Sequence, residues 1–314
     1  MEFTSVNKLY QEAFKKNWDR PAISNYHGET LHYKDVARRM EKLHIMFEEC
    51  GLEKGHKVAI CSRNQANWAV TFLAIMTYGA VPVPLLHEFK SANIHHLVNH
   101  SEAKILFVDD VIWEGLSESE MPDLQAIIQV NTFKILYAAD ERIVKAKNHL
   151  NELFGRKYPE AFEPQMLDYY EDSEDELAVI NYTSGTSGFS KGVMIPYRAL
   201  LSNVLFAQEV VPNINNKSNI VSMLPTAHMY GMMFEFLFEM TVGAHVHFLT
   251  RIPSPRIIME AFATIKPDVI ISVPLIIEKI YKQKLQPILN KTSMKVLLKL
   301  PVIDQLLQAK IKDE

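Results

Sequence analysis

Short runs of consecutive apolar residues alternate with longer amphipathic stretches along most of this chain, and this alternation limits its fold more than any other feature. The runs "KVAIC" (57–61), "KILFVDD" (104–110) and "AIIQV" (126–130) are apolar at successive positions. A strand with one face in water would alternate apolar and polar residues, so we expect these strands to be buried on both faces. Such strands separated by helices predict the α/β class, with layered, parallel-rich sheets flanked by helices.

The longest amphipathic stretch is "LHYKDVARRMEKLHIMFEECG" (31–51), which we read as a helix that stops at Gly51. Its apolar residues share one helical face, namely Val36, Met40, Leu43 and Phe47. Further helices are predicted at 66–78, 91–100, 197–211, 255–265 and 275–285, and further strands at 79–83, 177–182, 219–224, 244–249 and 267–274. Residues 131–176 are less regular and end in the acidic run "YYEDSEDE", typical of a solvated loop. We place a subdomain boundary there, which divides the chain into 1–176 and 177–314.

Composition excludes some classes of protein. The net charge of -4 gives no basic footprint for nucleic acid. The uncharged run at 67–86 has the length of a membrane span, but Gly79, Pro82 and Pro84 interrupt it, which favours a core helix followed by a buried strand. The two cysteines, Cys50 and Cys61, have neither metal-ligand nor disulfide-framework spacing, so we expect a cytoplasmic protein.

The segment "NYTSGTSGFSKGVMIP" (181–196) combines glycines, hydroxyl side chains and one lysine between two apolar segments. Gly185, Gly188 and Gly192 let the backbone approach a ligand closely, and successive N–H groups can form an anion-binding nest. The hydroxyls can donate further hydrogen bonds, namely those of Thr183, Ser184, Thr186, Ser187 and Ser190. Lys191 adds a positive charge suited to a polyphosphate. A phosphate cradle and a plain loop both remain open on these residues alone.

The two common nucleotide-binding patterns do not match this loop. In the P-loop pattern G-x-x-x-x-G-K-[ST], counted from Gly185, Ser190 stands at the second glycine and Gly192 at the Ser/Thr position. No G-x-G-x-x-G pattern is present at the loop either. The loop is therefore phosphate-like but belongs to neither class.

The loop does resemble the signature of another family. "YTSGTSGFSKGVM" is similar to the motif [Y/F]-T-S-G-T-T-G-x-P-K-G-V of the acyl-adenylate-forming (AMP-binding) enzymes, with Ser187 and Ser190 as departures. The segments "LHYKDV", "FLAIMTYGAVPVPL", "LPTAHMYGM" (224–232) and "KPDVIISVPLIIEKI" (266–280) resemble further elements of that family in the same order. The V-P-x-x-x-E-K-I ending is most similar to long-chain fatty acyl-CoA synthetases. The resemblance runs from about residue 30 to the end.

The resemblance implies a ligase that uses ATP, Mg²⁺ and coenzyme A as co-substrate to convert a fatty acid, or another carboxylic acid, first to acyl-AMP and then to acyl-CoA. The residues that it assigns to the phosphates of ATP are Thr183, Ser184, Gly185, Thr186, Ser187, Gly188, Lys191 and Gly192. Lys191 and His228 are the implied catalytic residues, and Thr183 is the implied approach to Mg²⁺. The implied acyl pocket comprises His228, Met229, Tyr230 and Gly231.

The family's later Y-G-x-T-E and T-G-D motifs and its C-terminal domain have no counterpart in these residues. We therefore expect an N-terminal part of the family's architecture, with the C-terminal domain absent and with little or no ligase activity of its own. Chain length of the acid, coenzyme A against a carrier protein as acceptor, peripheral membrane contact and oligomeric state stay open.

Alternatives from the residues themselves also stand. His228 could be a hydrogen-bonded core residue, and the pairs His95–His96 and His245–His247 are read as structural or exposed rather than metal-binding because no Cys or carboxylate set accompanies them. A P-loop-type nucleotidase and a non-catalytic nucleotide-binding or regulatory protein are the rival functions.

Overall fold

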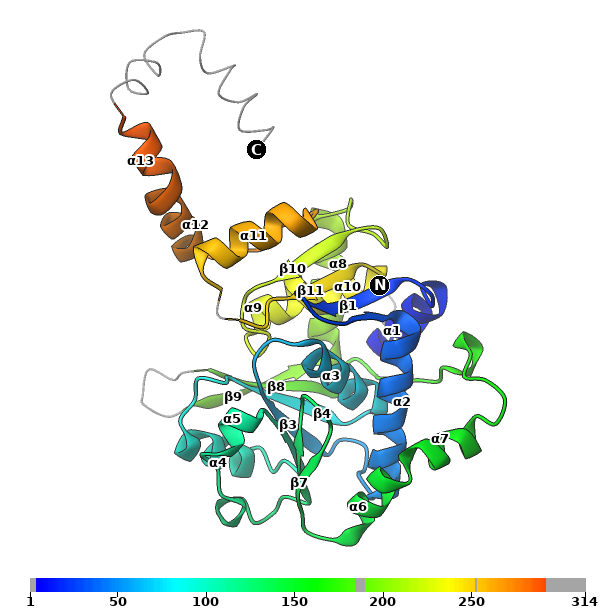
Figure 1. The fold of residues 1–314 in the computed structure, drawn as a ribbon. Helices are drawn as coiled ribbons and strands as arrows, with labels where there is room; N and C mark the ends of the chain where they lie inside the picture. The colour runs from blue at the N-terminus through cyan, green and yellow to red at the C-terminus, as the bar shows by residue number, and fades with distance from the viewer. Residues whose placement is uncertain (1–3, 184–189, 252, 292–314) are drawn as a thin grey trace.

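The computed structural model describes residues 4–183, 190–251 and 253–291. In these residues the strands form three sheets, and Figure 1 shows the two larger ones stacked one above the other, with helices around them. The strands are β1 (Pro21–Asn25), β2 (Thr30–His32), β3 (Lys57–Cys61), β4 (Val81–Leu85), β5 (Ile105–Val108), β6 (Ala126–Gln129), β7 (Ile135–Ala138), β8 (Leu177–Thr183), β9 (Lys191–Pro196), β10 (Asn219–Ser222) and β11 (His245–Phe248).

Helices cover these sheets and also lie between them. The α-helices are α1 (Val6–Lys16), α2 (Tyr33–Glu49), α3 (Ala66–Tyr78), α4 (Ser91–His100), α5 (Asp110–Trp113), α6 (Glu141–Asn148), α7 (Leu150–Lys157), α8 (Tyr197–Val210), α9 (Met229–Met232), α10 (Phe238–Val242), α11 (Pro255–Ile265), α12 (Pro274–Ile280) and α13 (Gln286–Leu289). The 3-10 turns are η1 (Glu118–Glu120) and η2 (Pro164–Met166), and the π-helical turns are η3 (Met233–Leu237) and η4 (Tyr281–Leu285). Figure 1 shows α2 running past both larger sheets on one side of the molecule.

The first large sheet has the order β4-β3-β5-β6-β7 within the described residues. Its strands β4, β3, β5 and β6 are parallel, and only β7 runs antiparallel, against β6. Every residue of β4 and β5 is buried, which is the burial that their continuous apolar sequence predicts. The α/β class and the parallel-rich sheets flanked by helices are therefore confirmed.

The second large sheet, with the order β10-β11-β1-β2, joins distant parts of the chain. β1 lies parallel to β11, with Ile23 opposite Val246, and β2 returns antiparallel along β1. Strands from the first 32 residues therefore complete a sheet whose other strands begin at residue 219. The division of the chain at residue 176 stays a prediction, and this pairing crosses it.

Helix α3 explains the long uncharged run at 67–86. Residues on all of its sides are buried, because α3 packs against strands of the first large sheet and also against η3. The Trp68 ring stacks on Phe72 (5.2 Å between centroids), and both rings meet Phe236 of η3 edge-on. β4 follows it as a buried strand. None of the helices in the described residues has the length and hydropathy that crossing a bilayer requires.

Several element predictions were wrong. No strand forms at 267–274, where only Val269 makes a single bridge, to Ile220. The helix predicted from residue 31 begins at Tyr33, because Leu31 and His32 belong to β2. The helix predicted at 275–285 is confirmed, as α12 from Pro274 to Ile280 and the π-helical turn η4 from Tyr281 to Leu285. The irregular region 131–176 contains β7, α6 and α7, whose short length gives a weak periodic signal.

Candidate functional site

The glycine- and hydroxyl-rich loop lies at the tip of an antiparallel hairpin. The pairing of β8 with β9 begins where Leu177 lies opposite Pro196 and ends where Thr183 lies opposite Lys191, the last pair before the tip. Thr183 and Lys191 are therefore direct cross-strand neighbours, and both are exposed. Five of the residues assigned to phosphate lie outside the described residues, namely Ser184, Gly185, Thr186, Ser187 and Gly188. Lys191 stands at the base of this tip.

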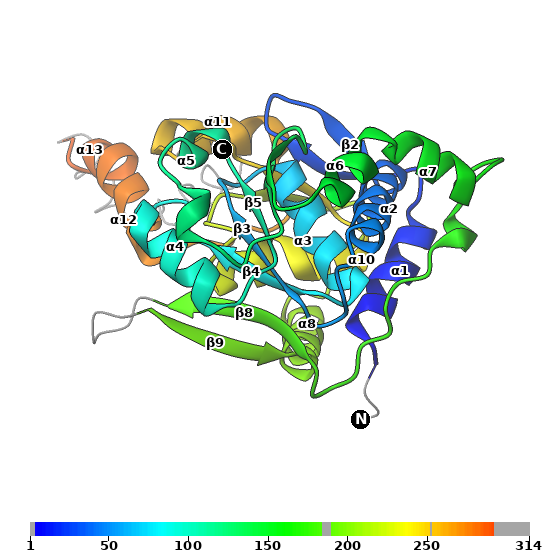
Figure 2. The same ribbon diagram turned by 90° about the horizontal axis from the view of Figure 1, so that it is seen from below.

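Gly192 is needed for packing within the hairpin. A Cβ atom there would lie 3.2 Å from the ring of Tyr182 and 3.2 Å from Cγ2 of Ile180. The Tyr182 ring is buried, which raises the pKa of its hydroxyl, and that hydroxyl shares a hydrogen bond with Nδ1 of His100 (2.7 Å). Helix α4 is thereby attached to the strand that leads into the loop; Figure 2 shows α4 beside the β8–β9 hairpin.

His228 stands at the start of α9 and is exposed. Its backbone N–H donates to the carbonyl of Pro225 (2.9 Å), and its own carbonyl accepts from the N–H of Met232 (2.9 Å). Of the other residues assigned to the acyl pocket, Met229 is half-buried and Tyr230 is exposed. Gly231 is buried, and a Cβ atom there would lie only 2.8 Å from Cβ of Leu224. The glycine thus lets α9 pack directly on the preceding turn.

One hydrogen bond connects the hairpin to the His228 turn. The buried Asn181 side chain, on β8, donates from Nδ2 to the carbonyl of Ala227 (2.8 Å). Ala227 immediately precedes His228, and Asn181 lies two residues before Thr183. The structure therefore attaches the base of the hairpin tip and the His228 turn to one another.

Two residues that sequence reasoning missed hold the turn from the other side. Asn64 donates to the carbonyl of Leu224 (2.6 Å) and accepts from both the N–H (2.9 Å) and the hydroxyl (3.1 Å) of Thr226. Glu235, in η3, accepts from the N–H groups of Met223 (3.0 Å) and Leu224 (2.9 Å). The signal available in the sequence for Glu235 was the presence of two carboxylates within the otherwise apolar run "MMFEFLFEM".

Glu235 and its neighbour Glu239 are both buried. Burial raises the pKa of Glu235 well above its usual range, against the lowering effect of its two backbone hydrogen bonds, and Glu239 raises it further. Burial alone raises the pKa of Glu239 to about 8. Burial therefore favours the protonated, uncharged form of both groups.

A cleft of about 640 Å³ lies where the carboxyl ends of strands from both large sheets meet. Asn25 is the last residue of β1, the residues 63–67 follow β3, Asp109 follows β5 and Thr250 follows β11. Asn25 also accepts through Oδ1 from the N–H of Ala66 (2.7 Å), so one sheet caps a helix of the other. The crevice outside the carboxyl ends of parallel strands is where ligands bind in open α/β sheets.

The chemistry of the cleft is polar. Asp109 is engaged by three donors, the hydroxyl of Ser62, the N–H of Arg63 and Nε2 of Gln65, each at 2.9 Å. An adjoining cavity of about 370 Å³ shares Arg63, Asn64, His87 and Thr250 with the cleft. Burial lowers the pKa of His87, which keeps its imidazole neutral at physiological pH. Asn64 thus lines the cleft and also holds the turn before His228.

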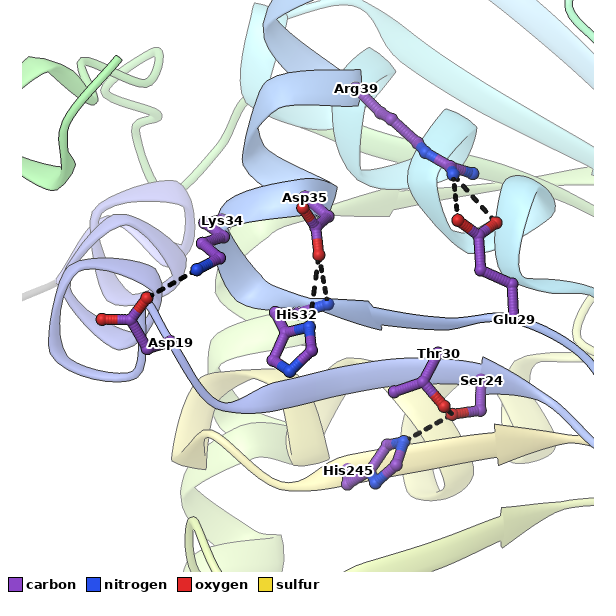
Figure 3. Close-up of polar contacts among 9 residues, drawn as sticks. All are labelled: Asp19, Ser24, Glu29, Thr30, His32, Lys34, Asp35, Arg39 and His245. Carbon is purple, nitrogen blue, oxygen red and sulfur yellow. Dashed lines mark hydrogen bonds and ion pairs between the residues drawn. The ribbon is translucent and has the colours of Figure 1, made fainter. Parts of the chain in front are cut away.

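The other histidine pairs are engaged in local contacts. His245 shares a hydrogen bond with the hydroxyl of Ser24 (2.7 Å; Figure 3), and His247 with Oδ1 of Asn219 (3.0 Å). Burial lowers their pKa values to about 3 and about 4. His95 accepts from the N–H of Ser117 (3.1 Å). In the described part of the chain, no group of three His, Cys, Asp or Glu side chains is arranged to hold a metal ion.

Comparison with known proteins gives the family. The model of the family described as "AMP-binding enzyme" matches residues 10–304. A long-chain-fatty-acid–CoA ligase of Homo sapiens is 24% identical over 289 residues, which cover 88% of this chain and 42% of that protein. A chloroplastic long-chain-fatty-acid–[acyl-carrier-protein] ligase of Arabidopsis thaliana is 26% identical and covers 89% of this chain and 39% of that protein.

Among solved structures, ATP-bound MatB from Rhodopseudomonas palustris has a TM-score of 0.71 and 20% identity, and covers 90% of this chain and 52% of that one. This likeness shows a shared fold. The chain thus spans about two-fifths of the length of the curated relatives that it matches and about half of that solved structure.

Proposed function

The chain belongs to the AMP-binding enzyme family, and we propose that it is part of an ATP-dependent carboxylic-acid ligase that forms acyl-AMP and then a thioester. The observation that supports the proposal is the cross-strand pairing of Thr183 with Lys191, a lysine at the base of the glycine- and hydroxyl-rich tip. Asn181 attaches the same strand to the turn that bears His228. Three ingredients of adenylation, namely phosphate contacts, positive charge and an acid-binding turn, would then lie on connected elements.

In the proposed first step, a carboxylate oxygen of the acid attacks the α-phosphorus of ATP, and the bond to the bridging oxygen of the pyrophosphate breaks. Negative charge develops on the leaving pyrophosphate. Such reactions are accelerated mainly by positioning and by charge stabilisation. The positive charge of Lys191 would stabilise the negative charge on the pyrophosphate, and the Thr183 hydroxyl would contact the phosphates or their Mg²⁺. Thr183 by itself does not make a metal site.

We further propose a long-chain fatty acid as the acid and coenzyme A as the acceptor. The names of the relatives support the first choice, and the V-P-x-x-x-E-K-I likeness at 273–280 supports the second. A relative named for an acyl-carrier-protein acceptor makes a carrier protein the competing choice. We propose that His228 lies beside the reacting carboxylate, with Met229, Tyr230 and Gly231 at the acyl pocket. We also propose that the cleft of about 640 Å³ at the carboxyl ends of the strands, here named the carboxyl-edge cleft, receives a substrate.

We also propose a division into subdomains 1–176 and 177–314, so that the hairpin and the His228 turn belong to the second and most of the cleft to the first. The proposed compartment is the cytoplasm. It is supported by Cys50 and Cys61, which are free, buried thiols whose pKa values burial raises. Thiols of this kind suit a reducing environment.

The test is calorimetric binding of MgATP to the 314-residue chain and to its Lys191→Ala variant, with Lys16→Ala, an exposed lysine of α1, as the matched control. Loss of a phosphate-contacting ammonium should raise Kd by about tenfold or more, equivalent to about 1.4 kcal/mol. An unchanged Kd in Lys191→Ala would remove the loop from the mechanism.

Two outcomes distinguish the rival functions. Steady ATP hydrolysis without any carboxylic acid would favour a nucleotidase. MgATP binding by the loop without acid-dependent ATP–pyrophosphate exchange in the full-length protein would favour a non-catalytic nucleotide-binding role. Exchange that requires a fatty acid and slows in Lys191→Ala would support the ligase, and a panel of acids would then give the chain length.

A further inference from the structure

A separate cavity of about 320 Å³ opens between α2, the β6–β7 turn, α6 and α7, and we name it the α2–α7 cavity. One stripe of α2 at helical spacing, Arg39, Lys42, Leu43 and Met46, forms one wall. None of its residues belongs to the hairpin or to the His228 turn. Arg39 alone is shared with the carboxyl-edge cleft.

Two ammonium groups in this cavity have no carboxylate partner among the described residues, namely those of Lys42 and Lys147. Lys42 donates only to the amide oxygen of Asn151 (2.7 Å). The neighbouring carboxylates are paired with other cations: Glu29 with Arg39, Glu41 and Glu48 with Lys157, Glu141 with Lys145, Asp140 with Arg142, and Glu152 with Arg156.

The two ammonium groups also repel other cations. Burial lowers the pKa of Lys42, and Arg38 and Arg39 lower it further. Burial likewise lowers the pKa of Lys147, and Lys42 adds to that effect. A bound anion would relieve this repulsion, which is the electrostatic condition for an anion site.

The rest of the cavity is apolar. Leu43 and Met46 are buried beneath it, and Leu150 and Phe133 line it. The Phe133 backbone has a φ of 55°, a left-handed conformation that bulky residues rarely adopt. Its ring packs edge-on against Phe107 and lies 6.0 Å from Nζ of Lys147. Positive charge therefore adjoins an apolar wall, as a ligand with an anionic head and an apolar chain requires.

Arg39 shows which head group fits. Its Nη2 donates to both oxygens of the Glu29 carboxylate (3.0 and 2.9 Å), and its Nη1 donates to Oδ1 of Asn67 (2.9 Å; the Glu29 pair is drawn in Figure 3). A cation that lines the cavity therefore already binds a carboxylate, and an anionic head group of the same chemistry would bind it in the same way. The other cations of α6 and α7 are paired with carboxylates, those of Lys145 and Arg156 within their own helices and that of Lys157 with α2, so this face offers one charged cavity rather than a broad basic surface for a membrane.

We propose that the α2–α7 cavity binds one single-chain amphiphile with an anionic head group, for which a fatty-acid carboxylate is the best match. Lys42 and Lys147 hold the head group, and the apolar wall holds the first part of the chain. Because Arg39 lines both this cavity and the cleft, a head group that competes with Glu29 for its guanidinium changes a wall of the cleft. This inference does not rest on the proposed ligase activity.

The test is calorimetric titration of the 314-residue chain, without nucleotide, with laurate, dodecyl phosphate and the neutral ester monolaurin. The variant Lys42→Gln/Lys147→Gln should lose one equivalent of laurate, or bind it at least about tenfold more weakly, while monolaurin binding stays unchanged. Lys145→Gln, on the same helix but paired with Glu141, is the matched control and should bind as the unchanged protein does. Since the two replaced groups repel neighbouring cations, thermal stability should not fall.

Other outcomes are also decisive. Unchanged laurate binding by the double variant would overturn the inference, as would equally tight binding of monolaurin at the same site. Dodecyl phosphate binding without laurate binding would overturn the carboxylate assignment. Leu150→Trp fills the cavity without changing charge and should also abolish this binding, so the inference stays testable if the double variant fails to fold. Lys191→Ala should leave it intact, which separates this result from the ATP test.

Discussion

The first large sheet and the segment from α11 to α13 contain similar apolar residues but bury them very differently. Every residue of β4 and β5 is buried, whereas α12 has no buried residue at all. Leu275 and Ile277 are 58% and 54% exposed. The difference lies in the neighbours: β5 has strands on both edges and side chains of helices against both faces, whereas α12 has α11 and η4 beside it. An apolar sequence therefore contributes stability only where other elements cover it.

The largest effect that this comparison predicts is for a pair of matched truncations. Phe72→Ala, in fully buried α3, should lower the free energy of unfolding by about 3–5 kcal/mol, because the cavity left between Trp68 and Phe236 cannot close. Leu275→Ala, in α12, should change it by less than about 0.5 kcal/mol. Urea unfolding of both variants measures the contrast, and equal losses would break the comparison.

Glycines give a second, smaller contrast. Gly231→Ala should destabilise by about 1–3 kcal/mol, because its Cβ atom would collide with Leu224. Gly155→Ala, in exposed α7, meets no atom within 4 Å and should stabilise by about 0.5–1 kcal/mol through its helix propensity. Thermal melts compare the two. Equal stability for both variants would mean that α9 does not depend on its close approach to the turn before His228.

Among the buried residues, Glu239 of α10 is ionisable. The pKa of Glu239 rises from an unfolded value near 4.5 to about 8, so the folded state binds more protons between these values. Stability contributed by this protonated acid is complete below about pH 4.5 and is lost as pH rises toward 8. Glu239→Gln should therefore raise the unfolding free energy by at least about 1 kcal/mol at pH 8 and change it little at pH 5.

The control for that measurement is Glu209→Gln at an exposed position of α8, which should give the same unfolding free energy as the unchanged protein at both pH values. Urea unfolding at pH 5 and pH 8 supplies the data. A Glu239→Gln effect that is independent of pH would mean that the native carboxyl titrates normally, contrary to its burial.

The sequence predicted those elements whose periodicity was strong. The strands at β3, β5 and β6 and the helices α2, α3, α4 and α8 follow from continuous apolar runs or amphipathic spacing. The hairpin of β8 and β9 was recognised as a loop between apolar segments, and its likeness to a family signature located the candidate site. The strand predicted at 267–274 does not form. The segment "PDVIISVP" is apolar enough for a strand, but among the described residues only its Val269 pairs with a strand, at Ile220.

The positioning of the candidate site was not accessible in the same way. Asn64, Asn181 and Glu235 act on residues between 11 and 162 positions away, and no local pattern marks such pairs. The burial of Glu235 and Glu239 was visible only as two acids in an apolar run. The α2–α7 cavity likewise brings together a helix near residue 40 and side chains near residue 150.

By itself the sequence determined the α/β class, the family and the residues that carry the signature loop, because these depend on composition and order along the chain. Only the tertiary structure decided that the first 32 residues complete the second sheet, that the His228 turn is held by three distant side chains, and that Lys42 and Lys147 share a cavity. The physical reason is that strand pairing, burial and charge interactions depend on distances in space, which sequence separation does not fix.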